Sequence, residues 1–257
     1  MTASLIVHQF PCLNDNYGYL IHDSANNLTA AIDTPDAITI QAELEAKGWK
    51  LTHILNTHHH GDHAGGNLAL KEAYDCHIIG AANDAHRIPG IDTRVSDGDK
   101  FQFGDFVVLV LETPGHTSGH IVYHLPDENM AFVGDTLFAM GCGRLFEGTA
   151  EQMWDSLGKI MHWPDETVIY CAHEYTLANG KFAQAVDTQN PALDARMEEV
   201  VKARNEGLPT VPTTLGLEKR TNPFLRAQDA DFAAGLGMAG QPAVEVFAEA
   251  RKRKDNF

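Results

Sequence analysis

Three histidines and an aspartate with metal-ligand spacing fall within six residues of this chain, and they constrain its fold more than any other feature. The run Thr57–His63 reads Thr-His-His-His-Gly-Asp-His, which gives His58, His60, Asp62 and His63 the pattern His-x-His-x-Asp-His. Neutral imidazole is the commonest protein ligand for divalent metals such as zinc. An apolar segment precedes the run and a glycine-led helical segment follows it. The cluster is therefore predicted to lie in a strand-to-helix loop, where functional groups are commonly displayed.

The spacing within this run also predicts how its side chains are shared. His58 and His60 are two residues apart, so in an extended segment they face one way and His59 faces the other. Asp62 and His63 are adjacent and diverge, so one ion cannot easily take all four ligands. The pattern therefore favours two metals side by side. A polar, solvated loop with an accidental histidine tract is the alternative.

Three further candidate ligands each follow a predicted apolar strand. His116 follows a strand that ends in Pro-Gly, Asp135 follows Ala-Phe-Val-Gly, and His173 follows Val-Ile-Tyr-Cys-Ala. Taken singly, such a histidine is usually only hydrogen-bonded and such an aspartate is usually part of a turn. Taken together they indicate one site, because the strand ends of one sandwich converge on one edge.

Seven protein ligands are too many for one tetrahedral zinc, so we expect two divalent ions, zinc first, with iron and manganese compatible. A hydroxide between the metals completes both shells and is the expected nucleophile. No Ser-His-Asp or Cys-His arrangement suggests a side-chain nucleophile, and Cys142 and Cys171 are interpreted as packing residues. The expected ligands are His58, His60 and His116 at one metal, Asp62, His63 and His173 at the other, and Asp135 as the bridge. Of the other histidines, His120 is expected to support the ligands from behind.

The order of predicted elements indicates an α/β (α+β) fold with two sheets covered by helices. Strands are predicted at 5–10, 17–22, 28–33, 51–57, 77–80, 106–112, 121–125, 130–134 and 167–172, with a hairpin turning at Gly104-Asp105. Helices are predicted at 36–47, 66–74 and 150–161. Beyond about residue 176 the chain is predicted to be all-helical, with helices at 177–186, 192–206, 229–238 and 242–254. Residues 208–224, rich in proline and threonine, are predicted to be a long connection. Residues 1–175 thus form one domain and 176–257 a small second one.

Charge and cysteine content restrict the partners and the compartment. A formal net charge of -16 argues against nucleic acid as a partner. No apolar run approaches the roughly 20 residues that span a membrane, and the first ten residues lack the pattern of an export signal. The four cysteines have no close spacing and are expected to be reduced thiols. We therefore expect a cytoplasmic monomer that binds neither nucleic acid nor membrane.

All of the net negative charge lies in residues 1–176, which hold 8 Lys and Arg against 24 Asp and Glu. Residues 177–257 hold 11 of each, and four of these cations are consecutive, from Arg251 to Lys254. They either face solvent at the C-terminal end of a helix, where cations interact favourably with the helix dipole, or form a clamp for an anionic small molecule.

These motifs resemble the metallo-β-lactamase superfamily. The pattern Thr-His-x-His-x-Asp-His is followed by Pro-Gly-His-Thr-x-Gly-His, Gly-Asp-Thr-Leu-Phe and His-Glu-Tyr-Thr. Within the superfamily the chain is most similar to the hydroxyacylglutathione hydrolases (glyoxalase II). The more specific segments are Gly141–Thr149, Cys171–Thr176, Thr221–Arg226 and the terminal Arg-x-x-Lys-Asp-x-Phe.

The resemblance implies an αββα sandwich followed by a helical domain that helps to hold glutathione. It implies hydrolysis of the thioester S-D-lactoylglutathione to glutathione and D-lactate, the second step of methylglyoxal detoxification. It also implies that Arg144, Tyr175, Arg251 and Lys254 contact the glutathione part. Many family members have tyrosine where this chain has Phe146, so a hydrogen bond made there is absent or replaced by water.

Three other functions remain as alternatives. A persulfide dioxygenase uses one iron and a reduced ligand set, which the full set here argues against. A β-lactamase lacks the helical tail. A metal-stabilised binding protein would show no turnover at all, and a thioesterase assay separates it from the enzyme.

The basic C-terminus yields a first prediction. Arg251 and Lys254 are three residues apart and share a helix face, so their joint removal should raise KM for glutathione thioesters by about one to two orders of magnitude. Each charge-assisted bond contributes roughly 1.5–3 kcal/mol. Steady-state kinetics of this variant should be compared with the double change at Lys252 and Arg253. An equal increase of KM in the two variants would show that the basic C-terminus acts only through its diffuse positive charge.

Overall fold

The first compact unit comprises Met1–Glu112 and Ser118–Gly134, and its larger sheet has six strands in the order β1-β2-β3-β4-β5-β6. The structure is a computed structural model that describes residues 5–257; the first four residues of the predicted catalytic domain lie outside the described residues. β1 to β3 pair antiparallel and β3 to β6 pair parallel. The strands are β1 (Leu5–Cys12), β2 (Asn16–Asp23), β3 (Leu28–Ile32), β4 (His53–Leu55), β5 (His77–Ala81) and β6 (Thr93–Val95).

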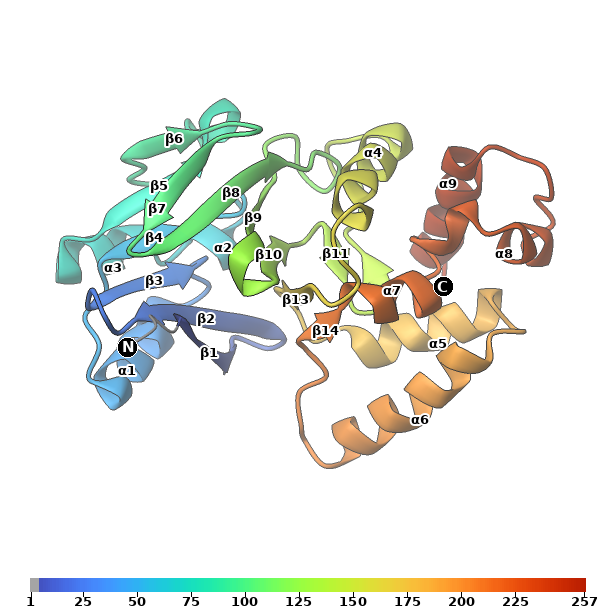
Figure 1. Cartoon of the computed structure of the whole chain (residues 1–257), viewed down its shortest axis with the longest axis horizontal. Coiled ribbons are helices and arrows are strands. Elements are labelled where there is room, and N and C mark those ends of the chain that lie inside the picture. The colour runs from blue at the N-terminus through green and yellow to red at the C-terminus, as the bar shows by residue number, and fades with distance from the viewer. Residues whose placement is uncertain (1–4) are drawn as a thin grey trace. The chain divides into compact units, whose positions relative to one another are not determined.

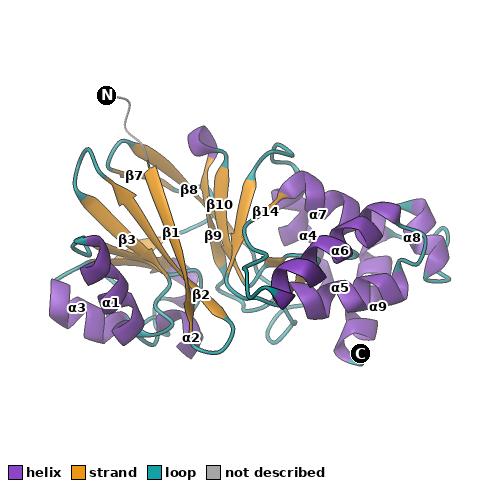
Figure 2. Cartoon of the chain, turned by 90° about the horizontal axis from the view of Figure 1, so that it is seen from below, coloured by secondary structure: helices purple, strands orange, loops and turns teal. Residues whose placement is uncertain are grey.

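Parallel neighbours need long crossover connections, and helices supply them here. α1 (Ala37–Lys47) connects β3 to β4, and the short α2 (Gly61–Ala64) and α3 (Asn67–Tyr74) connect β4 to β5. Figure 2 shows α1 and α3 side by side on one face of the sheet. Ile40, Leu44 and Leu70 are almost fully buried beneath them. The turn that leaves β4 for α2 carries the histidine run.

The other face of this sheet packs on four antiparallel strands, in the order β10-β9-β8-β7. They are β7 (Lys100–Phe103), β8 (Phe106–Glu112), β9 (Ile121–Leu125) and β10 (Met130–Gly134). The rings of Tyr19 and Phe132 meet edge to face with centroids 5.6 Å apart. The buried Tyr123 hydroxyl donates to the Asn56 carbonyl at 2.8 Å. These contacts join the two layers directly behind the histidine run.

The second unit comprises Thr113–Thr117 and Asp135–Phe257, and it is mainly helical. Its strands are short: β11 (Leu137–Phe138) pairs with β12 (Gly141–Cys142), and β13 (Val168–Cys171) pairs with β14 (Thr213–Thr214). Figure 1 shows its long helices α5 and α6 as an antiparallel pair. A core of Met140, Ala183, Leu193, Met197 and Val200 lies beneath that pair. The helices are α4 (Ala150–Met161), α5 (Thr176–Val186), α6 (Pro191–Asn205), α7 (Leu215–Thr221), α8 (Ala230–Gly235) and α9 (Ala243–Asp255).

Most predicted elements are found, but the prediction for 208–224 is wrong. That stretch contains β14 and α7, so the C-terminal part is not purely helical. Local propensity concealed α7, because the segment is rich in threonine and bounded by prolines. Its stability comes from tertiary contacts, since Glu218 is fully buried and ion-paired with Arg196 of α6. The two-residue strands β11 and β12 were also not predicted, as they are too short to show periodicity.

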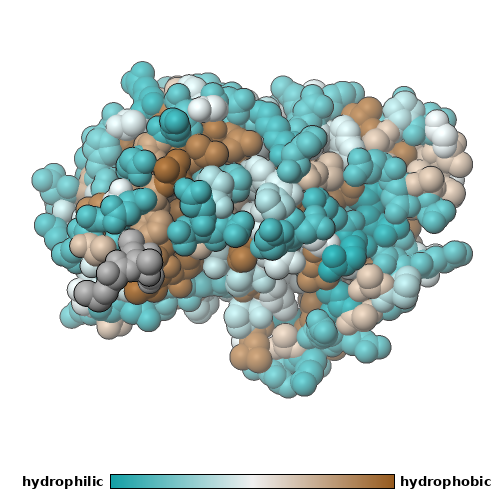
Figure 3. Space-filling view, in the orientation of Figure 1, coloured by the Kyte–Doolittle hydropathy of each residue, from teal (hydrophilic) through white to brown (hydrophobic). Residues whose placement is uncertain are grey.

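The surface view in Figure 3 is mostly hydrophilic, as the high charge requires, with apolar atoms gathered over the strands of the first unit. Among the described residues, no helix is long and apolar enough to cross a membrane. All four cysteines are free thiols, as predicted, and all four are buried.

The hairpin between β7 and β8 turns at Gly104-Asp105 as predicted, and it offers a test of the fold. Gly104 has φ +59, and a Cβ there would lie 1.9 Å from Asp23 Oδ2. The Gly104→Ala change should lower the free energy of unfolding by more than the about 1–2 kcal/mol that a left-handed φ costs, because it also displaces Asp23. Denaturant unfolding measures this loss.

The matched control is Gly98→Ala, since Gly98 has φ +82 but no heavy atom within 4 Å of a built Cβ. Equal losses in the two variants would show that Asp23 adapts without cost.

Candidate metal site

The Asp33 carboxylate, at the end of β3, orients two of the candidate ligands. Asp33 Oδ1 accepts from the Thr57 backbone N–H at 2.7 Å. Asp33 Oδ2 accepts from the Thr57 hydroxyl at 2.7 Å and from His63 Nδ1 at 2.8 Å. Because the single hydroxyl proton of Thr57 goes to Asp33, Thr57 Oγ1 accepts from His58 Nδ1, 3.1 Å away. One buried carboxylate therefore fixes the rings of both His58 and His63.

These hydrogen bonds also decide which nitrogen of each ring is available. A neutral imidazole carries one proton, so donation from Nδ1 leaves the lone pair on Nε2. Such a bond from the second nitrogen to a carboxylate or carbonyl is the usual support of a metal-binding histidine. The ring of His120 stacks on the ring of His58, with centroids 4.8 Å apart.

His59 faces away from its neighbours, as the two-residue alternation predicts. Its Nδ1 donates to Asp84 Oδ2 at 2.9 Å, whereas His58 Nε2 and His60 Nδ1 lie 3.0 Å apart. Asp62 and His63 lie on α2, with Asp62 Oδ2 3.6 Å from His63 Nε2. The buried Asn16 amide donates to Asp62 Oδ2 at 3.1 Å and so holds that carboxylate in place.

The remaining candidate ligands surround the Asp135 carboxylate. Its Oδ2 lies 3.3 Å from His116 Nε2, and its Oδ1 lies 3.3 Å from His173 Nε2. His116 Nδ1 donates to the Arg144 carbonyl at 2.9 Å, which leaves Nε2 as the available nitrogen. One carboxylate oxygen thus faces each histidine, the arrangement that a bridging carboxylate requires.

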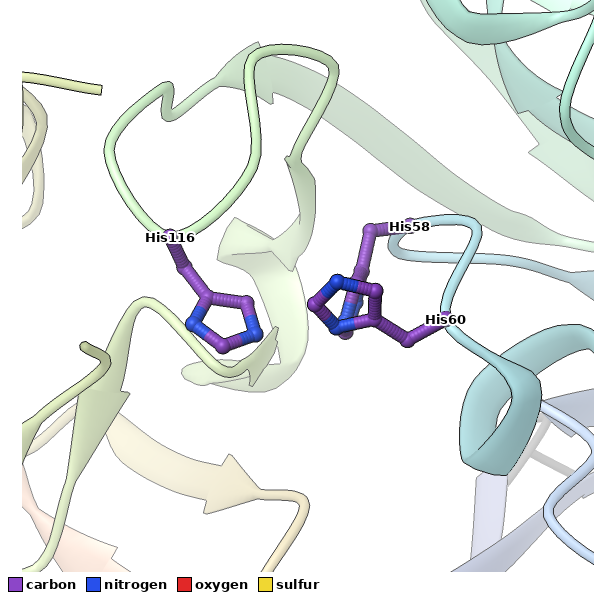
Figure 4. Close-up of side chains that lie close together, drawn as sticks. All are labelled: His58, His60 and His116. Carbon is purple, nitrogen blue, oxygen red and sulfur yellow. The ribbon is translucent and has the colours of Figure 1, made fainter. Parts of the chain in front are cut away.

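All seven candidate residues occur in three groups whose ligand atoms lie within 4.8 Å of one another. Figure 4 shows the rings of one group, His58, His60 and His116, pointing toward one another. Two nitrogens bound to one tetrahedral zinc at about 2.1 Å lie roughly 3.4 Å apart. The distances between neighbouring ligand atoms, 3.0, 3.3 and 3.6 Å, match that spacing, so the residues present fit divalent metal ions. The other groups are His58, His63 and Asp135, and Asp62, His63 and His173.

The two cysteines near the ligands in sequence are packing residues, as predicted. Burial raises the pKa of Cys142 to about 11 against the opposing effect of Arg251, and burial raises the pKa of Cys171 to about 12. The Cys171 thiol donates to the His173 carbonyl at 3.7 Å. Neither sulfur is a thiolate nucleophile at neutral pH.

The candidate substrate residues have different surroundings. The Arg144 side chain is exposed, and the half-buried Tyr175 ring stacks on His173 with centroids 4.7 Å apart and planes 1° apart. Lys254 is partly buried, and its Nζ lies over the Phe182 ring at 5.3 Å. Burial lowers the pKa of Lys254, and the charges of Arg251 and Arg144 lower it further. A bound carboxylate would relieve that repulsion among the cations.

Arg251 is 4% exposed and its guanidinium is largely engaged. One nitrogen donates to the Cys142 carbonyl at 3.0 Å, two others contact Asp255 Oδ1, and the group lies over Phe224. Lys252 and Arg253 are exposed, as the three-residue spacing predicts. Removing Arg251 therefore also loosens α9 from β12, so Lys254→Ala alone is the cleaner test of charge.

Sequence reasoning missed the residues that hold the ligands, namely Asp33, Thr57 and Asn16. Asp33 follows an apolar strand just as Asp135 does, which is the one signal that could have indicated it. Its partner His63 lies 30 residues away, and Asn16 is 46 residues from Asp62. No local spacing connects such pairs.

The family model of the metallo-β-lactamase superfamily matches residues 32–173. The model described as hydroxyacylglutathione hydrolase C-terminus matches residues 174–257. Among solved structures, the chain is similar to ETHE1 from Myxococcus xanthus, with TM-score 0.69 and 29% identity over 96% of this chain and 90% of that one. It is also similar to a protein solved in a di-iron-bound form, with TM-score 0.62 and 25% identity over 86% of this chain and 100% of that one.

The chain therefore belongs to the metallo-β-lactamase superfamily and has its fold, with mixed α/β sheets and a helical C-terminal region. The hydroxyacylglutathione hydrolase of Rhizobium meliloti (strain 1021) is 56% identical over 99% of this chain and 100% of its own length. That of Methylococcus capsulatus is 53% identical over 98% and 99%. Within the superfamily, the chain is a member of the hydroxyacylglutathione hydrolase family, a family of hydrolases. The predicted fold class and family resemblance are confirmed.

Asp33 yields the prediction for this site. The Asp33→Asn change should weaken zinc binding about 10–100-fold, because an outer carboxylate that orients a metal-binding histidine typically contributes that much. Competition with a chromogenic chelator measures the zinc affinity of the folded protein.

The matched control is Asp84→Asn, which alters an equally buried carboxylate that accepts from a histidine outside the ligand set. Zinc affinity that falls equally in the two variants would contradict the role of Asp33.

Proposed function

We propose that this chain hydrolyses S-(2-hydroxyacyl)glutathione thioesters, with S-D-lactoylglutathione giving glutathione and D-lactate in methylglyoxal detoxification. Near full-length identity of 51–56% to proteins named hydroxyacylglutathione hydrolase supports the substrate class. The observation that carries the proposal is the Asp135 carboxylate, with one oxygen facing His116 and the other facing His173 at 3.3 Å. A bridging carboxylate with six further ligands suits a hydrolytic two-metal centre.

The proposed ligands are those that the sequence predicts: His58, His60 and His116 at one ion, Asp62, His63 and His173 at the other, and Asp135 between them. Two ions are supported by the three overlapping groups of ligand atoms and by the relative solved in a di-iron-bound form. Zinc is proposed first, since imidazole and carboxylate donors suit it. When bound, such a pair supplies hydroxide at neutral pH as the nucleophile and polarises the thioester carbonyl.

The protein's own residues position the substrate and keep the ligands fixed. Asp33 and the Arg144 carbonyl hold the rings of His63 and His116, so each presents Nε2. The Arg144 side chain, Lys254 and the remaining N–H of Arg251 bind glutathione carboxylates, and Tyr175 contacts the glutathione part beside His173. The leaving thiol has a pKa near ~8.5, so its thiolate departs without a dedicated general acid.

The remaining assignments belong to this proposal as well. Residues 1–175 are the catalytic domain and 176–257 the glutathione-binding domain, and the family models divide the chain at a similar point, between 173 and 174. We propose a cytoplasmic monomer that binds neither nucleic acid nor membrane. The charge of -16 and the four free thiols are consistent with these assignments.

The proposed bridge gives the deciding experiment. Asp135→Ala removes a carboxylate that faces both His116 and His173, so it should lose metal and nearly all hydrolysis of S-D-lactoylglutathione. Metal analysis of the purified protein and a thioesterase assay measure the two effects.

The control is Asp127→Ala, at an exposed aspartate that is not among the proposed ligands. An Asp135→Ala protein with two bound metals and ordinary turnover would overturn the binuclear assignment. If the native protein binds metal but shows no thioesterase activity, the chain is a metal-stabilised binding protein and not a hydrolase.

A further inference from the structure

The hairpin that follows Asp135 is held almost entirely by side chains from distant helices. Its strands β11 and β12 pair only through Leu137 with Cys142 and Phe138 with Gly141. The Asn222 amide donates to the Phe138 carbonyl at 3.1 Å and to the Gly141 carbonyl at 3.0 Å. The tip is held as well, because the Met140 N–H donates to Glu218 Oε2 at 2.8 Å.

The side chains that hold the hairpin are themselves hydrogen-bonded and shielded from solvent. Asn222 and Glu218 are fully buried, and the Asn222 amide also donates to Glu218 Oε2 at 3.0 Å. The other oxygen of Glu218 is paired with Arg196 and accepts from the Thr213 hydroxyl at 2.7 Å. Asn222 Oδ1 accepts from the Phe224 N–H at 3.0 Å, which completes its hydrogen bonding. Buried polar groups bonded this completely tolerate few alternative arrangements.

The hairpin in turn contacts three proposed metal ligands. A Cβ on Gly143 would lie 2.1 Å from the Asp135 carbonyl and 3.1 Å from His116 Cβ, so the backbone is packed directly on both. The next residue, Arg144, accepts from His116 Nδ1 through its carbonyl. At the other end, the Phe138 ring meets the His173 ring edge-on, with centroids 5.8 Å apart.

We propose that Asn222, together with Glu218, is a positioning residue for the metal centre. By fixing the hairpin, it sets the places of Asp135, His116 and His173, and it places Arg144 toward the substrate. The Thr221–Arg226 segment, one of the family-specific motifs, thereby acquires a physical role in metal binding. This inference rests on the proposed ligand set.

The hairpin needs this support because its own conformation is unfavourable. Met140 has φ +53, a left-handed value that side chains other than glycine rarely adopt. A residue in this conformation persists only where surrounding contacts hold it there. Here the hydrogen bond from the Met140 N–H to Glu218 does so. Without Asn222 the two hairpin carbonyls lose their donor, and the ligands on either side lose their fixed spacing.

The test compares Asn222→Ala with Asn190→Ala in the full-length chain. Asn190 is a matched control, because it is also buried and also donates to one carboxylate, Asp187, and one carbonyl, that of Arg220. These bonds connect the start of α6 to the Arg220 carbonyl of α7, and neither of them reaches the hairpin. Both variants should lose thermal stability, measured as Tm.

The two variants should differ in zinc affinity, measured by chelator competition on the folded proteins. Asn222→Ala should raise the zinc Kd at least about tenfold, in the range found for residues that orient metal ligands. At saturating zinc, its KM for S-D-lactoylglutathione should rise severalfold, because Arg144 is displaced. Asn190→Ala should leave both values near those of the native protein.

Equal zinc Kd values in the two variants at similar Tm would overturn the proposal. If Asn222→Ala does not fold, Asn179→Ala replaces it, since Asn179 makes a single 3.2 Å bond to the Ala139 carbonyl in the same turn. A native zinc Kd in that variant would overturn the proposal too. The zinc measurement uses no substrate, so it decides this inference independently of the thioesterase activity.

Discussion

The three hydrogen bonds accepted by the Asp33 carboxylate are the interaction on which the histidine run depends. They come from the Thr57 backbone, the Thr57 hydroxyl and His63, and through the hydroxyl they reach His58. Asp33 has φ +58, so the chain turns sharply as it leaves β3 and aims the carboxylate at the neighbouring loop. A strained backbone and a buried charge are both costly. Both are tolerated at Asp33 because the hydrogen bonds that this conformation permits to its carboxylate are all formed.

The three remaining candidate ligands are held in position in a different way. There, short strands and tight turns place His116, Asp135 and His173, and the bonds that fix them are made largely to backbone carbonyls. A neutral carbonyl behind His116 pulls less on its proton than the Asp33 carboxylate does on that of His63. The two proposed metal positions thus differ electronically although both are built from histidine and aspartate.

The sequence predicts those parts of the fold and site that are encoded over a few residues. Strand ends, helix periodicity and the His-x-His-x-Asp-His spacing are local, and every candidate ligand derived from them lies in one of the groups that could hold a metal. Asp33, Asn16 and Asn222 were not found, because each acts on a segment at least 24 residues away. The helix α7 was missed for the same reason, since the Arg196–Glu218 pair stabilises it. Arg251 and Lys254 show a further limit of the sequence. Both are cations on one face of α9, yet Arg251 is enclosed by protein and Lys254 is only half-buried.

Arg144 contributes to the site through two groups that are chemically independent. Its carbonyl holds the His116 ring, while its guanidinium is exposed and free to meet a ligand. Every amino acid carries the same carbonyl, so replacing the side chain leaves the support of His116 in place. If the guanidinium binds the substrate as proposed, natural variation of this side chain can change which thioesters are accepted without disturbing the proposed metal ligands. Substrate selectivity can then change at a residue whose backbone carbonyl holds one of those ligands in place.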